Sequence, residues 1–173
     1  GFIVLKRLSD AIRDKDRIYA LIHGSGLSND IGGNLLAPDT EGQIRAMTLA
    51  YQNSGWTPFD VDHIECHGTG TPVGDGIELK SMQAIWGQEG WTRGQCAIGS
   101  VKSMIGHLLT GAGIAGAIKT LLALHRQTLP PSLNFRRPGK GSPLENGPFR
   151  IESTATEWKR RKNHPRRAAL SAF

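Results

Sequence analysis

Residues 61–75 read VDHIECHGTGTPVGD, a strand-like run followed directly by a loop of histidine, glycine and threonine. The run 61–66 is typical of a β-strand, and a helix is predicted to start near Asp75 and to carry apolar residues as far as Ile85. In open α/β sheets, ligands bind beyond the carboxyl ends of the strands. Because His67 follows this strand directly, we expect it to lie in a functional site.

A second stretch, residues 99–107, reads GSVKSMIGH and has the same order of features. A short strand at 96–98 leads into a polar loop, and we expect His107 to start a long amphipathic helix. The positive end of that helix would favour a neutral imidazole that donates a hydrogen bond. Two neutral histidines that converge on one point suit a carbonyl or anionic oxygen, with Lys102 as a fixed cation nearby.

The rest of the chain alternates strand and helix patterns. We expect strands at 2–5, 18–22, 149–151 and 168–172, helices at 8–13 and 40–53, and a glycine-rich loop at 24–38. The run 18–22 is expected to be buried on both faces. The alternation predicts an α/β fold with a mostly parallel sheet.

The composition places the chain among ordinary globular domains. It has 173 residues, of which 38% are hydrophobic and 21% charged, and it contains no apolar run long enough for a membrane span. Six of its 21 cationic residues fall within nine positions, and without them the chain is neutral. They are Lys159, Arg160, Arg161, Lys162, Arg166 and Arg167. We interpret this run first as a solvated connector, then as a docking site for an acidic protein; nucleic acid is the least favoured reading and is not predicted.

The two cysteines, Cys66 and Cys96, are expected to be reduced thiols of a cytoplasmic protein, since no export signal opens the chain. Cys66 and His67 could form half of a zinc site, but no second pair with metal-ligand spacing completes it, so no metal is predicted. The glycine motifs match neither a dinucleotide fingerprint nor a phosphate-binding loop. A single histidine after a strand is more often structural than catalytic, so residue types alone leave enzyme and binding module open.

Longer motifs give a specific resemblance. The stretch 67–75, together with Glu78, closely resembles the H-G-T-G-T-x-x-G-D-x-x-E motif of β-ketoacyl synthases, and 99–107 resembles their G-S-V-K-S-N-I-G-H signature. The spacing of 40 residues between the two histidines is also similar. Residues 2–11, 129–135 and 166–173 resemble further segments of the family, so the resemblance covers essentially the whole chain.

The resemblance implies a thiolase-like fold with α-β-α-β-α layers, of which this chain is mainly the C-terminal half. Residues 1–173 are expected to be a partial ketosynthase domain, the end of the N-terminal half plus most of the C-terminal half, truncated at both ends. The resemblance also implies roles for individual residues. His67 and His107 would be the catalytic histidines, Lys102 with Glu78 would order the site with support from Asp75, and Thr69 and Thr71 would contact a phosphopantetheine arm.

The implied reaction is a decarboxylative Claisen condensation in polyketide or fatty-acid synthesis. A malonyl group on an acyl carrier protein extends an acyl chain held on a cysteine, and no tightly bound cofactor is implied. Neither Cys66 nor Cys96 stands at the nucleophile's position, so we expect the missing N-terminal half to supply it and the chain alone to be inactive. A homodimer is expected by analogy. The alternatives are a catalytically silent, chain-length-factor-type partner and a carrier-protein-docking module.

Overall fold

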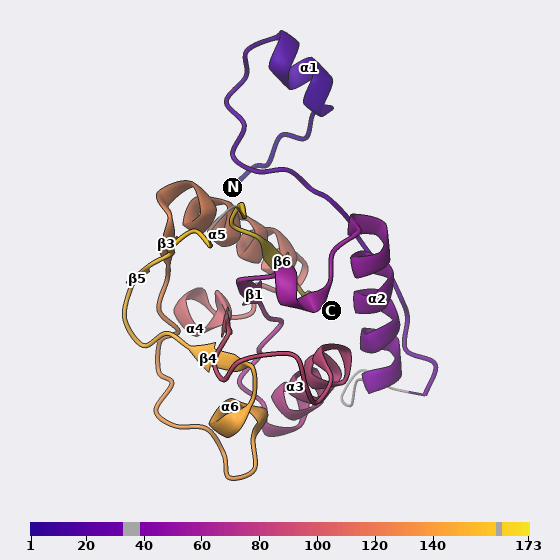
Figure 1. Cartoon of the computed structure of the whole chain (residues 1–173), viewed down its shortest axis with the longest axis vertical. Coiled ribbons are helices and arrows are strands. Elements are labelled where there is room, and N and C mark those ends of the chain that lie inside the picture. The colour runs from indigo at the N-terminus through magenta and orange to yellow at the C-terminus, as the bar shows by residue number, and fades with distance from the viewer. Residues whose placement is uncertain (33–38, 162–163) are drawn as a thin grey trace.

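A four-stranded parallel sheet forms the centre of the computed structural model, which describes residues 1–32, 39–161 and 164–173 (Figure 1). Its strand order is β4-β2-β1-β6. The strands are β1 (His63–Glu65), β2 (Cys96–Gly99), β4 (Phe149–Ile151) and β6 (Ala168–Leu170). His63 lies opposite Ala97 on one side and Ala168 on the other, so β1 is paired along both edges. The α/β prediction with a parallel sheet is confirmed.

Three long helices surround the sheet, and the remaining elements are short. The long helices are α2 (Thr40–Ser54), α3 (Pro72–Trp86) and α5 (Ala112–Arg126). The short helices are α1 (Leu8–Arg13), α4 (Lys102–Ile105) and α6 (Pro143–Asn146), with 3₁₀ turns at Pro58–Asp60 and Leu109–Gly111. An antiparallel pair, β3 (Thr128–Leu129) and β5 (Thr156–Glu157), completes the described structure. Among the described helices, none combines the length and apolar character needed to span a membrane.

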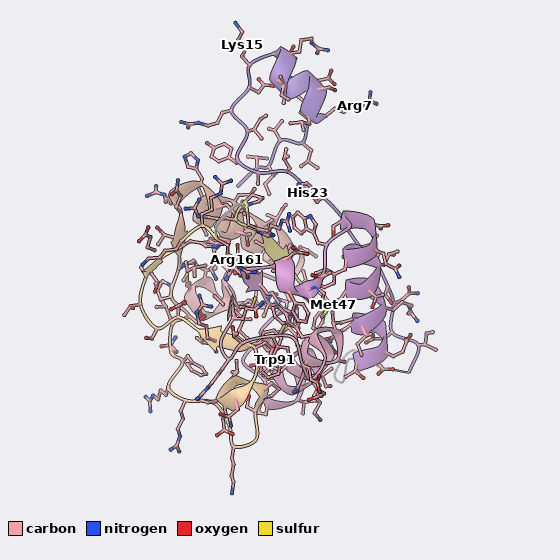
Figure 2. The ribbon with its side chains drawn as sticks, in the orientation of Figure 1. Arg7, Lys15, His23, Met47, Trp91 and Arg161 are labelled. Carbon is pink, nitrogen blue, oxygen red and sulfur yellow. The ribbon has the colours of Figure 1, made fainter. Side chains whose placement is uncertain are left out.

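The two faces of the sheet contact different helices. Ile64 and Ile98 belong to the larger core cluster, which includes Met82 and Trp86 of α3. Met47 of α2 packs against the same cluster, and its position is labelled in Figure 2. The intervening residues face the other way: Ala97 packs with Ala123 of α5, and Glu65 pairs with Lys119 of the same helix. Because side chains alternate along a strand, β1 separates an apolar face from a face that carries charge.

Two of the predicted helix starts are wrong. Helix α3 begins at Pro72, ahead of the expected start near Asp75, because the Thr71 hydroxyl accepts a hydrogen bond from the Gly74 N–H and proline suits the first turn. Helix α5 begins at Ala112 rather than at His107. Leu108 and Leu109 have φ of 57° and 46°, a left-handed conformation that no right-handed helix can continue through. The stretch expected to be only loop before His107 contains α4.

The N-terminal segment departs most from expectation. Helix α1 is present as predicted and lies apart from the rest of the molecule, with Arg7 directly before it and Lys15 shortly after it (Figures 1 and 2). Residues 2–5 and 18–22 are not strands, and Phe2 is fully exposed. An apolar run becomes a strand only when a neighbouring strand takes its hydrogen bonds, and the described strands pair with one another instead. Residues 24–32 are irregular as expected, and 33–38 of that predicted loop lie outside the described residues.

Part of the basic run is engaged within the chain, so its interpretation as a solvated connector is wrong for Arg161, Arg166 and Arg167, whereas Lys159 and Arg160 are exposed. Arg161 pairs with the buried carboxylate of Asp62 (Nε–Oδ1 2.5 Å), and Arg167 pairs with Asp60 (2.7 Å). The Arg167 guanidinium also lies over the Trp56 ring, 4.5 Å from its centroid. These contacts hold the segment before β6 against the start of β1, where Figure 2 labels Arg161. Arg166 donates to the carbonyl of Trp158, and Lys162 lies outside the described residues.

Candidate functional site

The structure brings His67 and His107 together. Their ring centroids are 5.2 Å apart and the ring planes are inclined at 77°, an edge-to-face arrangement. His67 follows β1 and His107 follows α4, so two separate βα connections supply the pair. The expected convergence of two imidazoles at the carboxyl edge of the sheet is present.

Hydrogen bonds to buried groups fix the loop that carries His67. The Glu78 carboxylate accepts from the backbone N–H of His67 (2.7 Å) and from that of Gly68 (2.8 Å), one oxygen for each. Gly68 has φ of +40°, and a Cβ on it would lie 2.9 Å from the Cβ of Ser100. Ser100 also donates from its hydroxyl to the carbonyl of His67. The two βα connections are therefore packed tightly against each other.

The last residue of the chain sets the tautomer of His67. The backbone N–H of Phe173 donates to Nδ1 of His67 at 3.2 Å, and the two rings stack with centroids 4.0 Å apart. Nδ1 is therefore an acceptor, and in the neutral ring the proton is on Nε2. Burial, followed by the positive charge of Lys102 and the nearby His107, lowers the pKa of His67 to about 4. At neutral pH His67 is an uncharged donor through Nε2.

His107 differs from the sequence prediction in its surroundings. It is exposed and lies before the 3₁₀ turn and α5, not in the first turn of the long helix. The expected effect of a helix N-terminus on its charge is therefore wrong, because that effect is confined to the first turn. Gly106, with φ of +77°, turns the chain after α4 and directs it toward His67.

Lys102 is the first residue of α4 and is partly buried. Burial lowers its pKa, and the negative charges of Glu78 and Glu65 oppose that effect. Glu78 reaches Lys102 through charge alone, since its oxygens bond to backbone N–H groups. Burial raises the pKa of Glu78 itself. The expected link between Lys102 and Glu78 is thus electrostatic.

The remaining expected site residues shape the loop after His67. The hydroxyls of Thr69 and Thr71 are 3.1 Å apart, and Thr71 caps α3. Asp75 accepts from the N–H of Gly70 at 3.1 Å, and burial raises its pKa. Thr71 is exposed and Thr69 is partly buried. Their contact with a phosphopantetheine arm stays a prediction.

Neither cysteine has the properties of a nucleophile. Cys66 and Cys96 are buried free thiols. Burial raises the pKa of Cys66 well above its ordinary value and that of Cys96 to about 12. A nucleophilic cysteine must be a thiolate near neutral pH, so both thiols are structural. Within the described ranges, no group of three or more histidine, cysteine, aspartate or glutamate side chains is placed to hold a metal ion.

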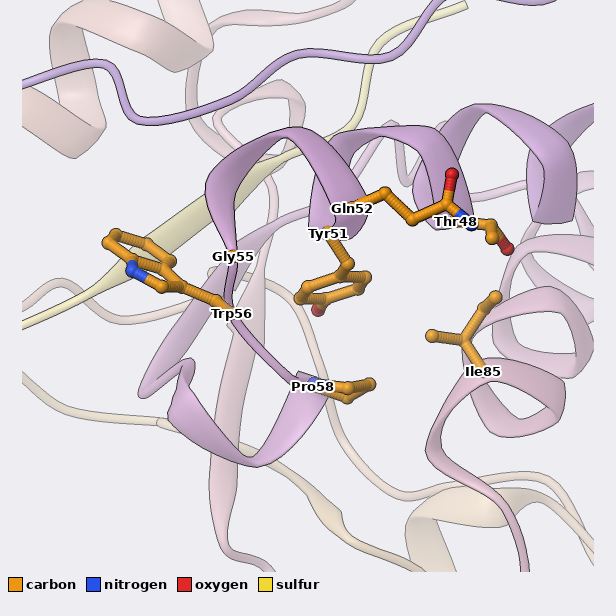
Figure 3. Close-up of a pocket in the computed structure, with 7 residues that line it drawn as sticks. All are labelled: Thr48, Tyr51, Gln52, Gly55, Trp56, Pro58 and Ile85. Carbon is orange, nitrogen blue, oxygen red and sulfur yellow. The ribbon is translucent and has the colours of Figure 1, made fainter.

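Hollows also lie elsewhere on the molecule. A shallow one of about 380 Å³ lies between α2 and α3 (Figure 3). It is lined by Thr48, Tyr51, Gln52, Gly55, Trp56, Pro58 and Ile85. A larger cavity of about 2150 Å³ separates the N-terminal segment from α2, α5 and the last residues, including Phe173. Among the described residues, neither His67 nor His107 lines either hollow.

Sequence reasoning missed Phe173 and Glu65 as parts of the site. Phe173 lay within a stretch that resembles the family, but a phenylalanine carries no chemical signal of its own. Glu65 is an acidic residue within a run interpreted as a buried strand, and a charge at such a position was the available signal.

The neutral state of His67 gives a testable prediction. We expect its ring signals in NMR of a complete ketosynthase domain to stay constant from about pH 8 to about pH 5 and to change near pH 4. Because this pKa lies below the unfolded value of 6.5, the stability that His67 contributes is present above pH 6.5 and is lost as the pH falls toward 4. Exposed His125 serves as the internal control. A His67 transition near pH 6.5 would contradict the prediction.

Comparison with known proteins agrees with this geometry. Residues 19–136 match the family described as "Beta-ketoacyl synthase, C-terminal domain". The chain is 40% identical over its full length to polyketide synthase PksL of Bacillus subtilis. It is also 40% identical, over 99% of its length, to a mycocerosic acid synthase-like polyketide synthase of Mycolicibacterium smegmatis. It spans only 4% and 8% of the length of these two relatives.

Solved structures give the same result. The ketosynthase from module 6 of the bacillaene synthase of Bacillus subtilis 168 aligns with a TM-score of 0.91 and 39% identity, covering 97% of this chain and 30% of that one. A structure named PfaC Keto synthase-Chain length factor aligns with a TM-score of 0.84 and 41% identity, covering 97% of this chain and 18% of that one. The chain therefore belongs to the β-ketoacyl synthase family and has the fold of the C-terminal part of a thiolase-like ketosynthase.

Proposed function

We propose that this chain supplies the two histidines and the lysine of a ketosynthase that performs decarboxylative Claisen condensation in polyketide synthesis. The observation that carries the proposal is the contact between the rings of His67 and His107, 5.2 Å apart at the carboxyl edge of a parallel sheet. The names of the relatives, which are polyketide synthases, support the substrate class. On this proposal the enzyme is an acyltransferase.

The geometry suits an enolate. His67 donates from Nε2, and His107 donates from the neighbouring ring, to the thioester oxygen of a malonyl group. The bond between the malonyl carboxylate and Cα breaks, carbon dioxide leaves, and the electron pair becomes the enolate that the two donors stabilise. Donors already in place cost no reorganisation when this charge develops. The enolate carbon then attacks the acyl thioester, a carbon–carbon bond forms, and the cysteine leaves as thiolate.

The nucleophile and the substrate carrier come from outside these 173 residues in this proposal. Since burial raises the pKa of both thiols in the chain, another segment of the ketosynthase provides the thiolate, and the chain alone does not condense. An acyl carrier protein delivers malonate on its phosphopantetheine arm, along the loop of Thr69 and Thr71. A homodimer in the cytoplasm, by analogy with the family, completes the proposal.

The alternatives receive less support. A silent, chain-length-factor-type partner has no use for His67, Lys102 and His107 in one cluster. A docking module based on the basic run would need free cations, but Arg161 and Arg167 are occupied by Asp62 and Asp60.

The test uses a complete ketosynthase domain that contains this chain, acylated in advance and supplied with malonyl carrier protein. We expect stoichiometric release of carbon dioxide and a β-ketoacyl product, detected by radiolabel trapping and mass spectrometry. The matched variant Cys66→Ala should keep this activity, because the thiol is buried and protonated. Absence of carbon dioxide release from the unaltered domain would favour the silent partner.

A further inference from the structure

A buried ion pair lies beneath the site and has no role in the mechanism above. The side chains of Glu65 and Lys119 are 1% and 9% exposed, and Glu65 Oε2 is 2.7 Å from Lys119 Nζ. Glu65 ends β1 and Lys119 comes from the middle of α5. Both residues lie outside the stretches that resemble the family's motifs.

Glu65 contacts each segment that carries the site. Its Oε1 accepts a hydrogen bond of 2.5 Å from the N–H of Val101, the residue directly before Lys102. Its backbone carbonyl accepts from the N–H of Ser171, two residues before Phe173. His67 follows two residues later, beyond the end of β1. One side chain and its peptide group thus join both βα connections and the segment that sets the tautomer of His67.

The surrounding backbone makes room for this pair. A Cβ on Gly116 of α5 would lie 3.1 Å from Cγ of Glu65, closer than an ordinary contact. A Cβ on Gly99 of β2 would lie 3.6 Å from Nζ of Lys119 and 2.8 Å from the Ser132 hydroxyl. Gly116 therefore permits the close approach of α5 to Glu65, and Gly99 permits the close approach of Ser132 beside the pair.

Stability alone is a weak reason to bury such a pair. Replacing a buried ion pair with apolar residues of similar size is often neutral or stabilising, because both charges lose their hydration. An apolar pair cannot accept the hydrogen bond that the N–H of Val101 donates to Glu65. The distinguishing property of Glu65 is thus an acceptor atom at a fixed point below Lys102.

We propose that Glu65 is a positioning residue, which sets the place of Lys102 and His107 relative to His67 through the N–H of Val101, with Lys119 as its counterion. This inference rests on the proposed function, since the distance between the two histidines matters only if both act on one substrate. Misplacement of catalytic groups by about 1 Å costs roughly 100-fold in rate.

Three variants of the complete domain separate positioning from packing. Glu65→Met with Lys119→Met removes both charges and the acceptor. Glu65→Gln with Lys119→Met removes the charges but keeps an acceptor oxygen for the N–H of Val101. Val101→Pro deletes the donor, and its ring takes the place of the N–H, so the Glu65 carboxylate has to move away from Val101; the φ of −60° at this position suits proline.

The measurements are thermal unfolding and the kcat and KM for carbon dioxide release from malonyl carrier protein. We expect the Met/Met and Val101→Pro variants to fold, to lose roughly 10- to 100-fold in kcat and to keep KM. The Gln/Met variant should recover most of the kcat.

The role of Glu65 is overturned if the Met/Met or Val101→Pro variant keeps the full kcat, or if the kcat of Gln/Met is no higher than that of Met/Met. Should Met/Met not fold, Val101→Pro and Gln/Met decide alone. If the unaltered domain releases no carbon dioxide, the proposed function fails as well.

Discussion

Replacing His107 with Ala should lower the rate of carbon dioxide release by about 10²- to 10³-fold, the usual cost of losing one donor to a developing oxyanion. His107 is exposed and makes its ring contact with His67, so its removal leaves the fold intact and takes away one of two donors. The KM for malonyl carrier protein should change little, because the lost interaction acts on the transition state. Trapping labelled carbon dioxide in single turnovers measures the effect.

The matched control is His125→Ala. This histidine is also exposed, but it lies on α5 and contacts the ring of Tyr19. Its replacement therefore removes an exposed histidine from outside the site. His67→Ala should resemble His107→Ala in decarboxylation, and the acyl group should still load onto the cysteine in at least one of the two variants. Unchanged carbon dioxide release in both would remove the histidines from the mechanism.

Glu78→Ala should be the most destabilising substitution in the site. The Glu78 side chain is buried and is the acceptor for two backbone N–H groups, those of His67 and Gly68. Its loss leaves two donors without partners and a void under the loop, which costs about 2–4 kcal/mol in the free energy of unfolding. Urea unfolding of the complete domain, followed by circular dichroism, measures this loss.

The comparison with Glu78→Gln separates hydrogen bonding from charge. The amide keeps one acceptor oxygen, so we expect this variant to recover part of the stability but not the negative charge that raises the pKa of Lys102. Exposed Glu89→Ala is the control away from the site and should stay within about 0.5 kcal/mol of the unaltered domain. Equal stability of Glu78→Ala and Glu89→Ala would show that the two N–H groups find other partners.

Local signals were sufficient for most of the elements that position the site. Helix α2 ends at Ser54, directly before Gly55, whose φ of +69° is the conformation that a glycine at a helix end predicts. Strands β1, β2 and β4 lie within or beside their predicted ranges. The histidine pair was also predictable, because each histidine follows a strand of one parallel sheet. Such features depend on residues close together in the sequence.

The errors concern features that depend on distant partners. Residues 18–22 have the composition of a buried strand, yet without a neighbour to accept its hydrogen bonds the segment stays irregular. The basic run was read as solvated because its partners, Asp60 and Asp62, are about 100 residues earlier in the chain. The start of α5 is a local exception: it lies at Ala112 because the two residues after His107, Leu108 and Leu109, have a left-handed backbone.

The orientation of His67 by a peptide N–H limits the chemistry available to it. In serine hydrolases a carboxylate behind the imidazole strengthens the ring as a proton acceptor. The backbone N–H of Phe173 is an uncharged donor and has the opposite effect. It occupies the basic Nδ1 atom, so the neutral ring can act toward a substrate only as a hydrogen-bond donor, through Nε2. A histidine held in this way is suited to polarising an oxygen and unsuited to activating water, which protects thioesters in the site from hydrolysis.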